Sequence, residues 1–150
     1  MIIFIGADHR GFALKQTVIP FLRRQGHEVI DAGTRVEGID CDYPQISRDV
    51  AAQVAKHAGS RGILLCMTGI GHSIAANKVP GAYAALVYNN KTAALSRRHN
   101  NANILVLGAK FIDEGAVEEI IAVWLATEFE GGRHARRFEQ IKNIEKEFLR

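Results

Sequence analysis

Cysteine is scarce in this chain of 150 residues, and so are proline and tryptophan. The two cysteines, Cys41 and Cys66, form no Cys-x-x-Cys motif and no Cys/His pairing with the spacing of a zinc site. Two isolated thiols are typical of a reducing compartment. The apolar start of the chain, 1–6, is too short for a signal peptide and runs into charge at Asp8. We therefore expect a soluble protein of the cytoplasm.

Long apolar runs and strong charge are also missing. No apolar run approaches the ~18 residues of a membrane span, and Lys+Arg 19 against Asp+Glu 16 leaves a net charge of only +3. Neither a membrane nor a nucleic acid is the expected partner, whereas a small anion such as a phosphate fits the mild positive excess. Because there is no linker, repeat or low-complexity segment, residues 1–150 are expected to form a single domain.

Short apolar runs alternate with segments of helical periodicity along the whole chain. This alternation predicts an α/β fold, with a five-stranded parallel sheet covered by helices on both faces and one further polar helix at the end. The run 63–67 is apolar at every position, which is typical of a strand buried on both faces. Strands are predicted at 2–6, 28–32, 62–67, 82–87 and 104–107, and helices at 11–24, 43–57, 71–78, 91–98, 113–127 (capped by Asp113) and 134–149.

The most informative segment is 66–73, Cys-Met-Thr-Gly-Ile-Gly-His-Ser, which follows a buried strand and opens a helix. Ligands of such sheets bind at the carboxyl ends of the strands. Glycines at 69 and 71 allow main-chain amides to point inwards and hold an anion such as an enediolate oxygen. Cys66 at the edge of this cradle is expected to be a stabilised thiolate that acts as a base. A buried strand cysteine beside a tight turn explains the spacing equally well.

Three other interpretations of this segment are weaker. A dinucleotide fingerprint needs a glycine where Ile74 stands, and Asn89-Asn90 after the fourth strand offers no acidic side chain for a ribose. A phosphate-cleaving thiolate loop needs an arginine to grip the phosphate oxygens, and the chain has His72 there. The Gly-Lys-Ser/Thr sequence of a Walker loop does not occur.

Three further groups stand where a site is expected, and each also has a simpler explanation. Asp8-His9 follows the first strand and either binds sugar hydroxyls or caps a helix. His99 precedes the fifth strand and protonates a ring oxygen only if it faces the cradle; otherwise it is structural or solvated. Arg133 and Arg137 lie one helical turn apart, which suits a phosphate, although a solvated basic patch is the commoner outcome. No cluster of acidic residues and histidines has metal-ligand spacing, so no metal is expected.

Taken together, these segments resemble the ribose-5-phosphate isomerase B family, which includes allose- and galactose-phosphate isomerases. The resemblance runs over nearly the whole chain, and the joint order and spacing of its short motifs are specific. The segments that carry it are 6–12 (Gly-Ala-Asp-His-Arg-Gly-Phe), 42–44 (Asp-Tyr-Pro), 66–71, 73–78, 95–100, 107–110 and 131–134 with Arg137.

The resemblance implies a cofactor-free isomerase of ribose 5-phosphate and ribulose 5-phosphate. It also implies a Rossmann-like three-layer αβα fold, assembled as a homodimer or tetramer with sites at the subunit interface. It gives Cys66 the role of proton-transfer base and His99 that of ring opening. The other implied site residues are Thr68 with the amides of Gly69, Ile70, Gly71, His72 and Ser73 for the enediolate, Asp8 and Tyr43 for substrate oxygens, His9, Arg133 and Arg137 for the phosphate, and Asn100 and Lys110 lining the site, partly from the neighbouring subunit.

Three positions depart from the family pattern. Met67 replaces the glycine that usually follows the cysteine, His72 replaces a commonly apolar residue, and Ala82-Tyr83 replaces Ile-Arg. Met67 and His72 flank the turn and are expected to shape the sugar pocket without changing the chemistry. The substrate is therefore open among ribose 5-phosphate, allose 6-phosphate, galactose 6-phosphate and a tetrose phosphate. A non-catalytic sugar-phosphate-binding module on the same fold is the alternative of a different class.

Overall fold

The computed structural model describes residues 1–148. Five strands form one sheet in the order β2-β1-β3-β5-β4, and every pairing is parallel. The strands are β1 (Ile2–Ala7), β2 (Glu28–Asp31), β3 (Arg61–Cys66), β4 (Ala84–Val87) and β5 (Ile104–Gly108), and the helices are α1 (Phe12–Arg24), α2 (Tyr43–Lys56), α3 (Ile70–Ala76), α4 (Asn90–Asn100), α5 (Val117–Ala126), which follows the 3₁₀ turn η1 (Glu114–Ala116), and α6 (Arg133–Phe148).

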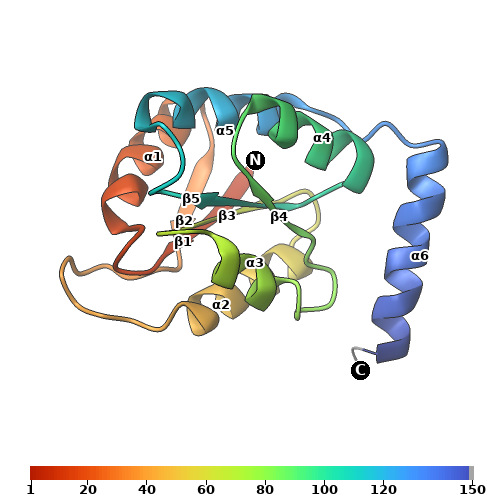
Figure 1. The fold of residues 1–150 in the computed structure, drawn as a ribbon, viewed down its shortest axis with the longest axis horizontal. Helices are drawn as coiled ribbons and strands as arrows, with labels where there is room; N and C mark the ends of the chain where they lie inside the picture. The colour runs from red at the N-terminus through yellow and green to blue at the C-terminus, as the bar shows by residue number, and fades with distance from the viewer. Residues whose placement is uncertain (149–150) are drawn as a thin grey trace.

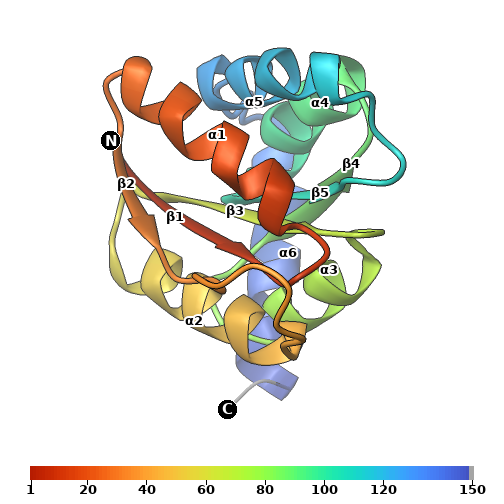
Figure 2. The ribbon, with the colours of Figure 1, turned by 90° about the vertical axis from the view of Figure 1, so that its left-hand side faces the viewer.

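Helices cover both faces of the sheet, which gives the expected Rossmann-like three-layer αβα arrangement (Figures 1 and 2). Helices α1, α4 and α5 lie on one face, and α2 and α3 lie on the other. The central strands are apolar on both sides, so the sheet separates two cores. One core contains Leu22 and Trp124, and the other contains Phe4 and Val50. This close packing fixes the positions of the strand ends, and therefore the points at which the following loops begin.

The predicted alternation of strands and helices is confirmed, and most element boundaries agree within two or three residues. The main difference lies at 113–127, which was expected to be one helix capped by Asp113. Asp113 accepts a hydrogen bond from the amide of Gly115 and begins the 3₁₀ turn η1 instead, and the α-helix starts only at Val117. A glycine in the first turn weakens a regular α-helical start, which explains the shorter helix.

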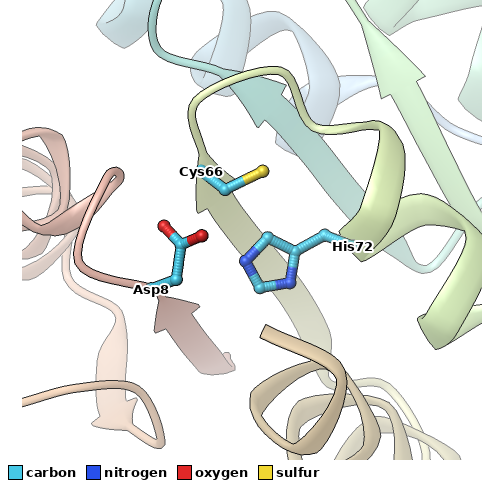
Figure 3. Close-up of side chains that lie close together, drawn as sticks. All are labelled: Asp8, Cys66 and His72. Carbon is cyan, nitrogen blue, oxygen red and sulfur yellow. The ribbon is translucent and has the colours of Figure 1, made fainter. Parts of the chain in front are cut away.

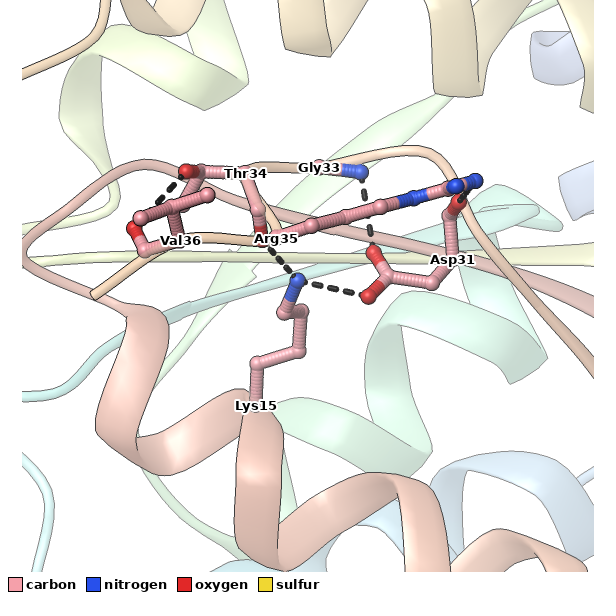
Figure 4. A network of polar contacts seen from close by, with 6 residues as sticks. All are labelled: Lys15, Asp31, Gly33, Thr34, Arg35 and Val36. Atoms are coloured by element: carbon pink, nitrogen blue, oxygen red, sulfur yellow. Dashed lines mark hydrogen bonds and ion pairs between the residues drawn. The ribbon is translucent and has the colours of Figure 1, made fainter. Parts of the chain in front are cut away.

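A buried ion pair joins α1 to the edge of the sheet (Figure 4). Lys15 is fully buried, and its Nζ lies 2.7 Å from Asp31 Oδ2 at the end of β2 and also donates to the Thr34 carbonyl. The amide of Gly33 donates to the same carboxylate at 3.0 Å. A buried charge needs such partners because it has lost its hydration. The contacts anchor the start of the long loop 32–42, whose Thr34 amide also donates to the carbonyl of Ala7 at the carboxyl end of β1.

Helix α6 is the expected additional helix, and it stands beside the sheet rather than on either face (Figure 1). It is held by α4 and by Phe138, whose ring packs 4.6 Å from that of Tyr83. Ile141, Ile144 and Phe148 are spaced along one stripe of α6 and are 43%, 58% and 72% exposed. The predicted end of this helix at 149 lies outside the described residues. Within residues 1–148, no helix is both long enough and apolar enough to cross a membrane.

Candidate functional site

The 66–73 turn is clamped between the two central strands, β3 and β5. Cys66 lies opposite Gly108 in the parallel register, and the amides of Ala109 and Lys110 donate to the carbonyls of Cys66 and Met67 at 2.8 and 3.1 Å. At Gly108 the turn packs directly on β5, because a Cβ there would lie only 2.5 Å from the Thr68 carbonyl oxygen. The first residues of the turn are therefore fixed by main-chain contacts to β5.

Main-chain amides of the turn point inwards, as expected for a cradle. The amide of Gly69 donates to Cys66 Sγ at 3.0 Å, and that of Ile70 donates to Thr68 Oγ1 at 3.2 Å. Gly69 has φ +80°, a left-handed conformation that favours glycine, and this lets the chain reverse into α3. The amide of Gly69 therefore points at the sulfur, which lies at the carboxyl edge of the sheet, where such folds bind ligands.

Burial raises the pKa of the Cys66 thiol, because a thiolate would lose its hydration in this position. Amides of the turn, above all that of Gly69, act in the opposite direction, and the negative field of Asp8 reinforces the increase. Burial and Asp8 therefore oppose the stabilisation of a thiolate that the turn amides provide. Cys66 is only 6% exposed, and burial is the largest of these effects, so the pKa of its thiol is raised.

Asp8 and His9 extend the site from the end of β1. Asp8 Oδ1 accepts the amides of Arg10 and Gly11 at 2.9 and 3.0 Å, which closes the turn before α1. The N-cap of α1 itself is Gly11, so the interpretation of Asp8 as a helix cap is wrong. Asp8 also lies beside Cys66 (Figure 3), so it belongs to the site as well. His9 Nδ1 accepts the amide of Cys41 at 3.3 Å, which ties the long loop to this edge of the sheet.

Tyr43 and Lys110 flank the same turn. The Tyr43 ring covers Gly71, where a Cβ would come within 2.5 Å of the ring, and it packs edge-on against His72 at 5.7 Å. Lys110 is joined to Met67 through the main chain, as described above. The structure thus brings together one set of expected residues: Asp8, Tyr43, Cys66, Thr68, Gly69 to Ser73 and Lys110, with His9 joining through the end of β1.

The other expected residues form a second set at the junction of α4 and α6. The rings of His99 and His134 stack at 4.0 Å with an interplanar angle of 8°. Glu130 Oε2 lies 3.7 Å from His99 Nε2 and 3.9 Å from His134 Nε2. Asn100 follows His99 at the end of α4, and Arg133 and Arg137 lie in the first two turns of α6. Burial, followed by the charges of His99 and Arg133, lowers the pKa of His134.

These two sets lie at opposite ends of the sheet. Cys66 is level with Gly108 at the carboxyl end of β5, whereas His99 comes just before Ile104 at its amino end. A strand of five residues spans about 13 Å between its first and last Cα atoms. His99 therefore does not face Cys66 within one chain. Arg133 and Arg137 belong to α6, which contacts the helix α4 that carries His99.

The three departures from the family pattern occupy different environments. His72 is fully buried, and its Nδ1 lies 2.6 Å from Ser47 Oγ because α3 turns this side chain towards α2. Its effect on the shape of the sugar pocket stays a prediction. Met67 is 40% exposed beside Cys66 and can meet a substrate. Tyr83 lies before β4 and packs on Phe138 of α6, away from the turn.

Among residues 1–148, two groups of three bring possible ligand atoms within 4.8 Å of one another: Asp8, Cys66 and His72, and His99, Glu130 and His134. Sequence spacing indicated neither group, because each joins residues from separate elements. Glu130 and His134 are the members that sequence reasoning did not assign to the site, and Ser47, which contacts His72, was missed as well. His134 follows a glycine pair and stands next to Arg133, which was the one available signal.

Comparison with known proteins places this geometry in context. The family described as Ribose/Galactose Isomerase matches residues 3–141. The probable ribose-5-phosphate isomerase B of Mycoplasma genitalium is 43% identical over 146 residues, covering 97% of this chain and 96% of that protein. Ribose-5-phosphate isomerase B of Escherichia coli is 42% identical over 143 residues, covering 95% of both chains.

Solved structures agree with the sequence relatives. Ribose-5-phosphate isomerase B of Clostridium thermocellum superposes with a TM-score of 0.95 at 47% identity, covering 99% of each chain. The M. genitalium enzyme with bound ribulose-5-phosphate superposes with a TM-score of 0.94 at 43% identity, covering 97% of each chain. The family match over residues 3–141, together with the identity and superposition over nearly the full length, shows that the chain belongs to the ribose/galactose isomerase family.

Proposed function

We propose that this chain interconverts ribose 5-phosphate and ribulose 5-phosphate, with Cys66 as the base that moves a proton between C2 and C1. The observation that carries the proposal is the position of Cys66 Sγ at the carboxyl edge of the sheet, 3.0 Å from the amide of Gly69 and within the amides of the 66–73 turn. Support comes from a solved relative that holds ribulose-5-phosphate and from relatives that bear the name of this activity.

The reaction starts from the ring form of the sugar, and His99 assists opening at the ring oxygen. The Cys66 thiolate removes the C2 proton, and the electron pair of that bond forms the C1=C2 double bond while charge moves to the C1 oxygen. Cys66 returns the proton to C1, and the proton of the C2 hydroxyl passes to the C1 oxygen. Amides of the turn hold the enediolate, while Arg133, Arg137 and His9 grip the phosphate.

Each site takes its two halves from different copies of the chain. The ring oxygen and C2 of an aldose are two bonds apart, so His99 and Cys66 must reach atoms that are nearly adjacent. Within one chain they lie at opposite ends of β5, about 13 Å apart by strand length alone. A symmetric pair of chains satisfies the geometry, because each turn then meets the α4–α6 junction of the partner.

Exposed apolar side chains offer a surface for that partner. Ile70 and Ile74 of α3 are 54% and 60% exposed, and the stripe Ile141, Ile144 and Phe148 of α6 is similarly open. Such apolar surface is typical of subunit interfaces. The α3 residues flank the turn and the α6 stripe continues from the phosphate-binding arginines, so docking at these surfaces closes the site.

Replacement of Cys66 tests the proposed base. Cys66→Ala should fold and bind a sugar phosphate but lose about 10²–10⁴-fold in kcat, the usual contribution of a positioned base. Cys41→Ala is the matched control, since Cys41 is the other free thiol and should leave kcat unchanged. Isomerisation is followed on ribose 5-phosphate, with a thermal shift as the binding measurement. Near-normal turnover by Cys66→Ala would remove the mechanism, and a ligand-dependent thermal shift without turnover in the unaltered protein would favour a binding module.

Complementation tests the shared site. Cys66→Ala and His99→Asn should each be inactive, yet a refolded equal mixture should regain about one quarter of the unaltered activity, because half of the dimers are mixed and each contains one intact site. No recovery, with dimers confirmed by light scattering, would place the complete site in one chain.

A different sugar phosphate is the second candidate, and Met67 is the observation that favours it. Met67 directly follows Cys66 in the chain and is 40% exposed, at a position where the family pattern has glycine. Assays on ribose 5-phosphate, allose 6-phosphate, galactose 6-phosphate and erythrose 4-phosphate compare kcat/KM directly. Met67→Gly should move the preference towards ribose 5-phosphate if the side chain narrows the pocket.

A further inference from the structure

Three polar side chains from different elements meet beneath the 66–73 turn (Figure 3). Asp8 comes from the end of β1, Cys66 from the end of β3 and His72 from α3, and their polar atoms lie within 4.8 Å of one another. All three are buried, with exposures of 7%, 6% and 0%. The proposed reaction uses only the sulfur, so the buried imidazole needs an explanation.

The hydrogen bonds of α2 determine which nitrogen of His72 carries the proton. Ser47 Oγ lies 2.9 Å from the Tyr43 carbonyl and 2.6 Å from His72 Nδ1. A carbonyl accepts only, so the single hydroxyl proton of Ser47 is donated to Tyr43. The hydroxyl oxygen must then accept from Nδ1–H. The neutral imidazole therefore has its lone pair on Nε2.

Nε2 of His72 has no hydrogen-bond partner, although it is completely buried. It is turned towards the Asp8 carboxylate and lies close to the Cys66 sulfur (Figure 3). A carboxylate cannot donate to a lone pair, and Oδ1 of Asp8 already accepts two amides. A buried acceptor without a donor is rare in folded proteins. Of the two neighbouring groups within 4.8 Å, only the thiol of Cys66 carries a proton that it can give. The site thus contains one proton acceptor and one proton source side by side.

We propose that His72 is the proton acceptor that activates Cys66. The S–H bond of the thiol breaks, its electron pair stays on sulfur, and the proton forms an N–H bond at Nε2. The resulting imidazolium donates to Ser47 through Nδ1 and to Asp8 through Nε2. The thiolate then takes the C2 proton of the sugar, delivers it to C1, and recovers its own proton from His72 when the product leaves. The inference rests on the proposed role of Cys66 as base.

The electrostatic environment supports a neutral resting pair. Burial lowers the pKa of His72 to about 4, opposed by the charge of Asp8 and by the Leu65 carbonyl. Burial raises the pKa of Cys66. The titratable groups of residues 1–148 that face the imidazole are Asp8 from β1, Cys66 from β3 and Tyr43 from α2, whose ring lies 5.7 Å away. Transfer between two neutral partners changes no net charge, so the fraction of thiolate made in this way does not depend on pH above the His72 pKa.

Alkylation of the thiol tests this pH independence without requiring turnover. In a Cys41→Ala background Cys66 is the only thiol, and its reaction with iodoacetamide measures the thiolate fraction. With His72 in place, the rate should form a plateau above the His72 pKa of about 4, up to the pH at which ionisation of the thiol to solvent exceeds the internal transfer. With His72→Leu or His72→Gln, the thiol must lose its proton to solvent, so the rate should rise about tenfold per pH unit below the thiol pKa. At pH 6 the variants should react at least about tenfold more slowly than the parent.

Two variants and a matched control keep the result unambiguous. His72→Leu fills the buried space and His72→Gln retains a polar side chain, so a folding defect in one leaves the other informative. His57→Gln removes an exposed histidine of the same chain and should leave the plateau intact. Identical pH profiles for parent and both variants, or a tenfold slope in the parent itself, would overturn the proposal. If the parent isomerises ribose 5-phosphate, the proposed function stands whatever the alkylation profile shows. If the parent shows the plateau but never isomerises, the proposed function fails while the role of His72 as proton acceptor stands.

Discussion

Replacing Gly108 with alanine should displace the 66–73 turn while leaving the sheet in place. The added Cβ would lie 2.5 Å from the Thr68 carbonyl oxygen and 2.7 Å from its carbon, both main-chain atoms that no rotamer change can move. Ordinary contact begins at 3.4 Å, so the turn must retreat by about 0.9 Å. A misplacement of about 1 Å at a reacting group costs on the order of 10²-fold in rate. The overpacking should cost about 1–3 kcal/mol in the free energy of unfolding.

The assay compares kcat on ribose 5-phosphate with urea unfolding of the same preparation. Gly115→Ala is the control, because a Cβ there meets only Asp113 Oδ1 at 3.5 Å, an ordinary contact. The control should keep both activity and stability, while Gly108→Ala should lose activity by far more than its fraction of unfolded protein explains. A Gly108→Ala protein with kcat within threefold of the parent would show that the turn does not depend on this close packing, and the reasoning would fail.

Two further perturbations test other contacts. Lys15→Met removes the buried cation that pairs with Asp31. That carboxylate is 23% exposed and keeps the Gly33 amide, so the free energy of unfolding in urea should fall by about 3 kcal/mol. A decrease below about 1 kcal/mol would refute the importance of the pair. Burial lowers the pKa of His72 from 6.5 in the unfolded chain to about 4 in the folded one. As the pH falls from 6.5 to about 4, the unfolded chain therefore binds a proton that the folded chain does not, and the free energy of unfolding should decrease by up to about 3 kcal/mol. His72→Leu should flatten this decline in the free energy of unfolding, and an unchanged pH dependence would contradict the assignment.

The sheet was predictable because its signals are local. The apolar run 63–67 identified a strand buried on both faces, and the glycines at 69 and 71 identified the turn that follows it. The placement of that turn at the carboxyl edge follows from the parallel topology alone. Local sequence also indicated Asp8 and the arginines of α6 as candidates, although it could not say which of them meet.

The remainder of the site depends on packing that no local pattern encodes. His72 and Ser47 are 25 residues apart, and their contact exists only because α3 packs on α2. The raised pKa of Cys66 likewise comes from burial. The glycines that free the turn amides are visible in the sequence, whereas the burial that opposes those amides is not. The distance between His99 and Cys66 required the strand register, which periodicity does not supply.

If two chains share each site as proposed, the opposite placement of the Cys66 turn and the α4–α6 junction makes the rate depend on protein concentration. A lone chain would then hold two half-sites that face different ways and would have no activity. Below the dissociation constant of the pair, specific activity should fall in proportion to total protein, and it should recover when substrate bridges two chains. Dilution leaves a self-contained enzyme unchanged, so it would distinguish such an enzyme from one with shared sites.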